Sequence, residues 1–233
     1  MKRFGFTLAE VLITLGIIGV ISALTLPSLL NDTQGAQVGP KLGKAVSMLE
    51  QANQAVLDEN NADSLSDAGL WQINAQNASG PYGEALSNHL KITPFRGTTY
   101  SIANDTGLSA TFTRSGANGG TNTWSAKDGV LYTFNFTQRD PANAPPHRQR
   151  IGRVFIDING EATPNLPGTD VFAFILMNDG SLTPVGAYAW NGNNADAQWR
   201  NNCQNDQTPT NSRYYTCTAS IFENNMKVLY KMR

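Results

Sequence analysis

Hydrophobic residues are concentrated in one long run near the amino terminus. Residues 6–30 read FTLAEVLITLGIIGVISALTLPSLL, and Glu10 is the only charged residue among them. As an α-helix that rises about 1.5 Å per residue, this run would span roughly 37 Å, which is enough to cross a hydrocarbon core of about 30 Å. The pattern therefore predicts a membrane-spanning helix.

A second helix, amphipathic rather than fully apolar, is predicted within residues 31–60. Its apolar residues recur three and four positions apart, so they share one face that has to be buried. Gly35, Gly39 and Pro40 disturb this pattern. A proline inside a helix removes one hydrogen bond at a cost of about 3 kcal/mol, so we expect a bend or a short interruption within residues 33–40. The apolar face comprises Val38, Leu42, Ala45, Val46, Leu49, Ala52, Val56 and Leu57.

The pattern later changes to short segments rich in Val, Ile, Phe, Tyr and Thr, which are separated by Gly, Asn or Asp. Such segments are typical of β-strands joined by turns, and Asn178, Asp179 and Gly180 predict a hairpin turn between two of them. The expected strands cover residues 99–103, 108–113, 121–126, 130–136, 151–158, 171–177 and 182–188.

Two short helices are predicted in addition. One covers residues 82–90, and the other covers residues 221–232, where Ser220 and Glu223 would form a capping box at its start. The predicted fold class is therefore α+β, with a long amino-terminal helix, its first half transmembrane, packed by its second half on an antiparallel β-sheet. The length of 233 residues fits such a helix and one exported globular β-rich domain, residues 61–233.

The composition argues against several classes of function. The 17 Lys and Arg residues are balanced by 18 Asp and Glu residues without a basic block, so a nucleic-acid partner is not expected. The chain contains no phosphate-binding loop, no nucleophile elbow and no zinc-protease motif. Its two histidines, His89 and His147, are far apart in polar surroundings. We therefore expect neither an enzyme nor a bound cofactor, with a calcium ion as the one alternative.

The residues before the hydrophobic run indicate how the chain is oriented. Lys2 and Arg3 favour the cytoplasmic side of a membrane, so the domain after the helix would be exported. A cleaved secretory signal and a plain anchor are the alternatives. A secretory signal has an apolar region of about 7–15 residues, which is shorter than this run. A plain anchor leaves Glu10 unexplained, because an acid at the membrane centre costs about 2.5–3.5 kcal/mol and usually marks a function.

Residues 2–10, KRFGFTLAE, resemble the prepilin signal of type IV pilins and type II secretion pseudopilins. The resemblance implies that a prepilin peptidase cuts after Gly5 and that Phe6 becomes the N-methylated amino terminus. It also implies that Glu10 is the acidic residue used in assembly, where it would pair with the amine of a neighbouring subunit.

The same resemblance implies a pilin-like fold and a structural function. Residues 1–5 would be the leader peptide, residues 6–30 the transmembrane and assembly helix, and residues 31–60 its amphipathic continuation. The subunit would cross the inner membrane once, with its amino terminus in the cytoplasm, before it enters an extracellular or periplasmic type IV pilus or type II secretion pseudopilus. Its partners would be other subunits, the prepilin peptidase, the inner-membrane assembly platform and the lipid bilayer.

Two other functions are alternatives. A minor or tip subunit would bind a surface, a sugar or DNA, and Trp124, Trp190 and Trp199 would be the first candidates for such contacts. A membrane-tethered enzyme would need a convergent polar pocket.

The two cysteines, Cys203 and Cys217, lie close together in the sequence. In an oxidising, exported compartment they predict a single disulfide, and a pair of buried thiols is the alternative.

Oxygen-bearing side chains cluster after one predicted strand. Asp157, Asn159 and Asp170 partly match a calcium-binding loop, although the EF-hand spacing is absent. The alternative is a hairpin in which Asn159 and Gly160 form a type I′ turn and both aspartates cap local amides. We favour the hairpin.

Overall fold

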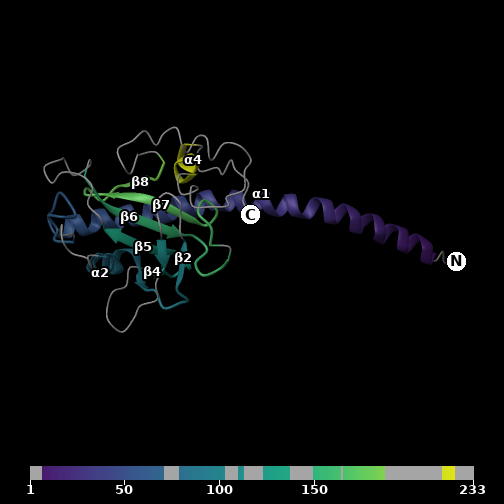
Figure 1. Ribbon diagram of the computed structural model, residues 1–233, viewed down its shortest axis with the longest axis horizontal. Helices are drawn as coiled ribbons and strands as arrows, with labels where there is room; N and C mark the ends of the chain where they lie inside the picture. Colours follow the sequence, from purple (N-terminus) through teal and green to yellow (C-terminus); the bar gives the residue numbers. More distant parts are fainter. Residues whose placement is uncertain are drawn as a thin grey trace, which may run out of the picture.

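The computed structural model describes residues 7–70, 79–102, 110–112, 123–136, 149–163, 165–186 and 217–223. Side chains are described for the same residues except 26–36, 79–80 and 110. An amino-terminal apolar helix is followed by a domain built on an antiparallel β-sheet, which confirms the α+β fold class. The apolar end of the helix projects away from this domain (Figure 1).

Helix α1 (Leu8–Glu59) runs through 52 residues without interruption. The interruption considered within residues 33–40 is therefore wrong, whereas the helix does depart from a straight line, as a gentle curve (Figure 1). Burial explains why Pro40 is tolerated, because Val38 and Leu42 on either side of it are 5% and 0% exposed and hold the helix on the sheet. The helix ends where Asn61 takes a left-handed conformation with φ 48°.

The main sheet has six antiparallel strands in the order β1-β4-β5-β6-β7-β8. From β4 onward each strand pairs with the next one in the chain, and β2 pairs with β3 in a separate two-stranded sheet. The strands are β1 (Ile92–Pro94), β2 (Tyr100–Ile102), β3 (Ala110–Phe112), β4 (Thr123–Ala126), β5 (Leu131–Phe136), β6 (Arg150–Asp157), β7 (Val171–Met177) and β8 (Leu182–Pro184).

Each expected strand coincides with a strand of the structure, from β2 to β8. The hairpin turn between β7 and β8 is confirmed, since the backbone N–H of Met177 donates to the carbonyl of Ser181 at 2.9 Å and Gly180 has φ 85°. Strand β8 is shorter than expected, because Gly186 adopts φ 107°, outside the range of extended strands. Strand β1 was not expected. It contains Pro94, which is tolerated because β1 lies at the edge of the sheet.

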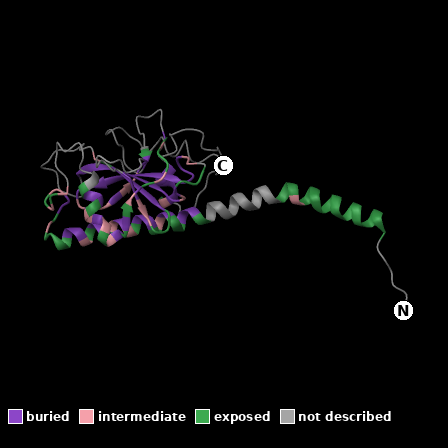
Figure 2. Cartoon of the chain, turned by 90° about the horizontal axis from the view of Figure 1, so that it is seen from below, coloured by how far each residue is buried: buried purple, intermediate pink, exposed green. Residues whose placement is uncertain are grey.

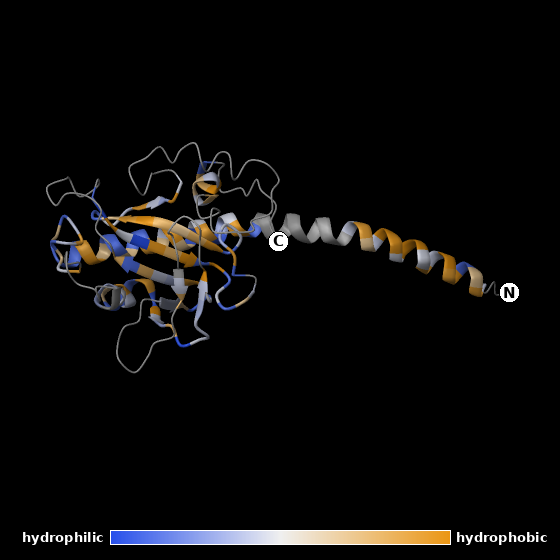
Figure 3. Ribbon diagram, viewed as in Figure 1, coloured by the Kyte–Doolittle hydropathy of each residue, from blue (hydrophilic) through white to orange (hydrophobic). Residues whose placement is uncertain are grey.

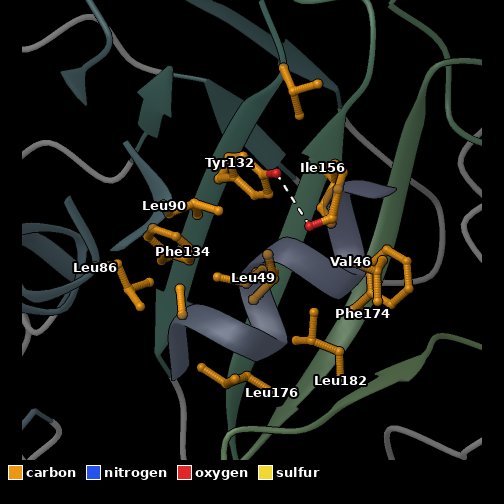
Figure 4. Close-up of a cluster of buried hydrophobic side chains, with 14 of the residues drawn as sticks. Val46, Leu49, Leu86, Leu90, Tyr132, Phe134, Ile156, Phe174, Leu176 and Leu182 are labelled. Carbon is orange, nitrogen blue, oxygen red and sulfur yellow. Dashed lines mark hydrogen bonds between the residues drawn. The ribbon is translucent and has the colours of Figure 1, made fainter. Parts of the chain in front are cut away.

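Both faces of the main sheet are buried. Helix α1 lies along one face, as Figure 2 shows, and the first core lies between them. In this core Leu49 contacts the sheet side chains, and the hydroxyl of Tyr132 donates to the carbonyl of Ala45 at 3.3 Å (Figure 4). The second core lies on the opposite face, where Phe112 packs with Phe155 and other apolar residues of β5, β6 and β7.

Two shorter helices complete the described structure. Helix α2 (Ser79–Leu90) confirms the helix expected over residues 82–90, and it buries Leu86 and Leu90 in the first core. Helix α4 (Cys217–Glu223) begins earlier than expected. Ser220 therefore lies inside this helix, and the capping box predicted at its start is wrong, because Cys217 and Ile221 are both fully buried and place the helix start before Ser220.

Candidate functional site

The amino-terminal end of α1 is closed by a reciprocal capping box. The Oγ1 atom of Thr7 accepts a hydrogen bond from the backbone N–H of Glu10 at 3.3 Å. In return, Glu10 Oε2 accepts from the backbone N–H and from the hydroxyl of Thr7, both at 2.8 Å. These bonds satisfy backbone groups that a helix start leaves unpaired. The Glu10 carboxylate is thereby held beside the residue that directly follows Phe6.

The segment that begins at this cap is apolar and exposed. By length and composition Leu8–Thr25 can cross a membrane, and none of it is buried inside the protein. Leu8 and Leu24 are 81% and 75% exposed. This end of α1 is mostly hydrophobic (Figure 3). The hydroxyl of Thr14 donates to the carbonyl of Glu10 at 2.9 Å, so this polar group needs no water. An apolar surface of this length is unfavourable in water and is consistent with a membrane anchor.

Gly5 and Phe6, the expected cleavage and methylation positions, lie outside the described residues. The pairing of Glu10 with the amine that cleavage would create at Phe6 therefore stays a prediction.

The connection between β6 and β7 brings the three predicted calcium ligands together. Asp157 ends β6, and Asp170 directly precedes β7. Asn159 joins them, because its backbone N–H donates to Asp157 Oδ1 at 3.1 Å and its side-chain Nδ2 donates to Asp170 Oδ2 at 3.0 Å. Asp157 is fully buried, and Asp170 is 3% exposed.

Both carboxyl groups are harder to ionise than in water. Burial raises the pKa of Asp157 to about 7, and the charge of Asp170 contributes to the rise, while a hydrogen bond from Tyr100 opposes it. Burial also raises the pKa of Asp170 to about 6, against the opposing effect of the backbone N–H groups of Leu166 and Asn165. A bound cation would counteract the rise in both pKa values, because a nearby positive charge favours the ionised carboxylates.

The contacts of this loop agree in part with the hairpin interpretation. Asp157 Oδ1 also accepts from the backbone N–H of Gly160 at 2.8 Å, and Asp170 accepts from the backbone N–H of Asn165 at 2.8 Å, so both aspartates cap local amides. In the orientation that pairs both of its polar atoms, the side-chain amide of Asn165 donates to Asp157 Oδ2 at 3.2 Å. The expected type I′ turn is wrong, since it needs positive φ at two residues and only Gly160, not Asn159, has it.

One feature of the loop supports a cation instead. The Oδ1 atom of Asn159 is buried and has no hydrogen-bond partner among the described residues. A buried oxygen without a partner is unfavourable, and carboxylate and amide oxygens are the ligands that calcium prefers. The structure places no group of three or more His, Cys, Asp and Glu side chains around a metal position within its described part, so such a site would depend on Asn159 and backbone oxygens.

The same loop contacts the segment before and within β2. The hydroxyl of Tyr100 donates to Asp157 Oδ2, and the backbone N–H of Thr98 donates to Glu161 Oε1. A cavity of about 450 Å³ lies beside these contacts and is lined by Arg96, Gly97, Thr98, Thr99 and Glu161. Sequence reasoning did not identify the contacts of Tyr100 with Asp157 or of Thr98 with Glu161, because the partners lie 57 and 63 residues apart and no local pattern marks them.

The other residues singled out in the sequence lie outside this loop or outside the described part of the chain. Trp124 is 3% exposed and packs against Gly83, so it is not a surface residue for ligand contact. Nε2 of His89 lies 3.1 Å from Glu59 Oε2, which ties the end of α2 to the end of α1. Cys217 is fully buried in α4. Cys203, His147, Trp190 and Trp199 lie outside the described residues, so the disulfide stays a prediction.

Comparison with known proteins identifies the amino-terminal segment. Residues 1–26 match the family model of the prokaryotic N-terminal methylation motif. No curated protein and no solved structure matches the chain. The matched residues include the Thr7–Glu10 capping box and the whole exposed apolar segment Leu8–Thr25. The first 26 residues of this protein are therefore the amino-terminal signal of type IV pilins and pseudopilins.

Proposed function

We propose that this protein is a structural subunit of a type IV pilus or of a type II secretion pseudopilus. The observation that carries the proposal is α1, in which the methylation motif opens a helix whose first part is exposed and apolar and whose second part is buried in the domain. A subunit built in this way can bury its apolar half first in lipid and then against other subunits. Its role would be structural rather than catalytic.

Processing would convert the membrane-held precursor into the assembling form. The prepilin peptidase would cleave between Gly5 and Phe6 and leave a methylated amine four residues before Glu10. The inner-membrane assembly platform would then pass the subunit into the filament, where Glu10 pairs with the amine of a neighbouring subunit. An ion pair is favoured there, because lipid offers neither charge any water.

The processing step is tested by the mass of the amino-terminal peptide from native membranes. The expected terminus is N-methylated Phe6. A Gly5→Val variant serves as the control and should retain the terminus at Met1. A wild-type chain that starts at Met1, or behind Ala23, would contradict the proposal.

We also infer a calcium ion at Asp157, Asn159 and Asp170, with the partnerless Asn159 Oδ1 as its support. Calorimetry on the full-length protein in detergent should give binding heat that the Asp157→Asn variant lacks. Asp67→Asn is the matched control, because this exposed carboxylate lies outside the loop and should leave binding unchanged. A wild-type titration without heat leaves the hairpin interpretation in place.

The proposed exported location also supports a Cys203–Cys217 disulfide. A ring of fifteen residues closed in this way would stabilise the fold by about 3 kcal/mol in the chain-entropy model. Non-reducing peptide mapping of the exported protein should recover the two cysteine peptides linked. Recovery of two unlinked thiol peptides would contradict the pairing.

A further inference from the structure

The two-stranded sheet of β2 and β3 covers part of the second core without joining the main sheet. Its strands form backbone ladders with each other, and the main sheet forms its own six-stranded ladder. Ile102 and Phe112 contribute to the core that contains Leu131 and Phe155. The ring of Tyr100 stacks on Phe112, with centroids 4.8 Å apart. Since a two-stranded hairpin is at best marginally stable alone, its position depends on contacts with the rest of the domain.

Among the described residues, two polar contacts join the segment before and within β2 to the connection between β6 and β7. Tyr100 donates to Asp157 Oδ2, and Thr98 donates to Glu161 Oε1. A Cβ atom added to Gly97 would collide with the Glu161 carboxylate, so the backbone before β2 lies directly on this side chain. The end of β6 is thus both an attachment point for β2 and part of the candidate cation site.

We propose that the β2–β3 sheet is a strap that opens and closes as a unit over the second core, and that Asp157 couples its closure to a cation bound at the β6–β7 connection. The coupling rests on the calcium site proposed above. A carboxylate has lone pairs for both a cation and the Tyr100 hydroxyl. A cation shared with Asp170 would hold Asp157 in the position from which it accepts the Tyr100 hydrogen bond. A ligand that favours the closed arrangement shifts the population toward it.

Hydrogen–deuterium exchange of the full-length protein in detergent, with chelator and with calcium, tests the strap. With chelator, the amides of β2 and β3 should exchange faster than those of β6 and β7, because a locally opening unit needs less free energy than the whole domain. Calcium should slow amide exchange in β2 and β3. It should leave the ratio of the exchange rate of β6 to that of β7 unchanged. The Tyr100→Phe variant keeps the ring on Phe112, should exchange about fivefold faster in β2 and β3, and should lose the calcium response.

Tyr132→Phe is the matched control, because its hydroxyl bonds to α1 in the first core. This variant should leave the ratio of β2–β3 exchange to β6–β7 exchange unchanged. Equal exchange rates in both regions under all conditions would overturn the strap. Calcium binding detected by calorimetry without a change in β2 and β3 would overturn the coupling. Absence of binding heat, together with faster β2–β3 exchange in Tyr100→Phe, would overturn the calcium site and the coupling while supporting the strap.

Discussion

The side chain of Asn53, near the carboxyl-terminal end of α1, donates a hydrogen bond from Nδ2 to the carbonyl oxygen of Gly180 in the β7–β8 turn at 2.6 Å. Its Oδ1 atom accepts a hydrogen bond from Tyr82 of α2 at 2.5 Å. Asn53 and Tyr82 are both fully buried, so one side chain satisfies two polar groups that water cannot reach. This contact fixes α1, α2 and the edge of the sheet relative to one another.

We therefore expect Asn53→Leu to lower the free energy of unfolding by about 2 to 4 kcal/mol, because two buried polar groups lose their partner. Gln54→Leu is the matched control, since Gln54 bonds to the carbonyl of Asp179 in the same turn at 3.0 Å but is exposed. Its effect should stay below about 1 kcal/mol. Urea denaturation of the detergent-solubilised chain measures both. Equal effects of the two substitutions would contradict the role given to burial.

A second prediction concerns the contact between α2 and β4. Alanine normally stabilises a helix relative to glycine by about 1 kcal/mol. A Cβ atom at Gly83, however, would overlap the indole ring of Trp124. We expect Gly83→Ala to lower the free energy of unfolding by about 1 to 3 kcal/mol, because the well-packed core must shift. Asn88→Ala, at an exposed position of the same helix, should change it by less than about 0.5 kcal/mol, and a stabilised Gly83→Ala variant would refute the overlap.

A third prediction concerns Glu10 and assembly. Glu10→Gln keeps the size of the side chain and removes the charge that would pair with a neighbouring amine. The variant should be cleaved and membrane-bound like the parent protein, but its amount in sheared filaments should fall about tenfold or more, which corresponds to a loss of roughly 1.4 kcal/mol. Immunoblots of membrane and filament fractions measure the ratio.

The control for this experiment is the Thr14→Val variant. The Thr14 hydroxyl bonds only to carbonyl groups of its own helix in the described contacts, so its loss should leave filament incorporation unchanged. Parental amounts of the Glu10→Gln variant in filaments would rule out the assembly role of Glu10.

A fourth prediction follows from the raised pKa values of Asp157 and Asp170, about 7 and about 6, against an ordinary value of 3.8. The folded protein binds protons at these groups more tightly than the unfolded chain does. Their contribution to stability is therefore fully present below pH 3.8 and is lost as the pH rises through 6 to 7.

In calcium-free buffer, the urea midpoint should thus be lower at pH 8 than at pH 5. Asp157→Asn, which does not ionise, should flatten this dependence. A wild-type midpoint that rises between these two pH values would contradict the prediction.

The elements that sequence analysis predicted correctly depend on local periodicity. The apolar residues from Val38 to Leu57 recur with the period of an α-helix, and the strand segments alternate with the period of a β-strand. Each pattern therefore indicates both the type of element and its buried face. The prediction failed at Pro40, where the local signal for an interruption is outweighed by packing against a sheet that lies far away in the sequence. It also failed at β1, whose three residues are too few to show a period.

The candidate site was also predicted only in part, because some of its contacts join residues that are far apart in the sequence. The aspartates and Asn159 lie within one connection, so their proximity could be read locally. The hydrogen bonds from Tyr100 to Asp157 and from Asn53 to Gly180 join residues 57 and 127 positions apart. Such contacts depend on how the strands and helices pack, and no short motif encodes them.

The continuity of α1 has a mechanical consequence. Its 52 residues form one continuous, gently curved helix of about 78 Å, which joins the membrane end directly to the half that is packed on the sheet. In a filament, axial load on the amino-terminal end would therefore pass to the globular domain through the backbone hydrogen bonds of one helix rather than through a linker without secondary structure.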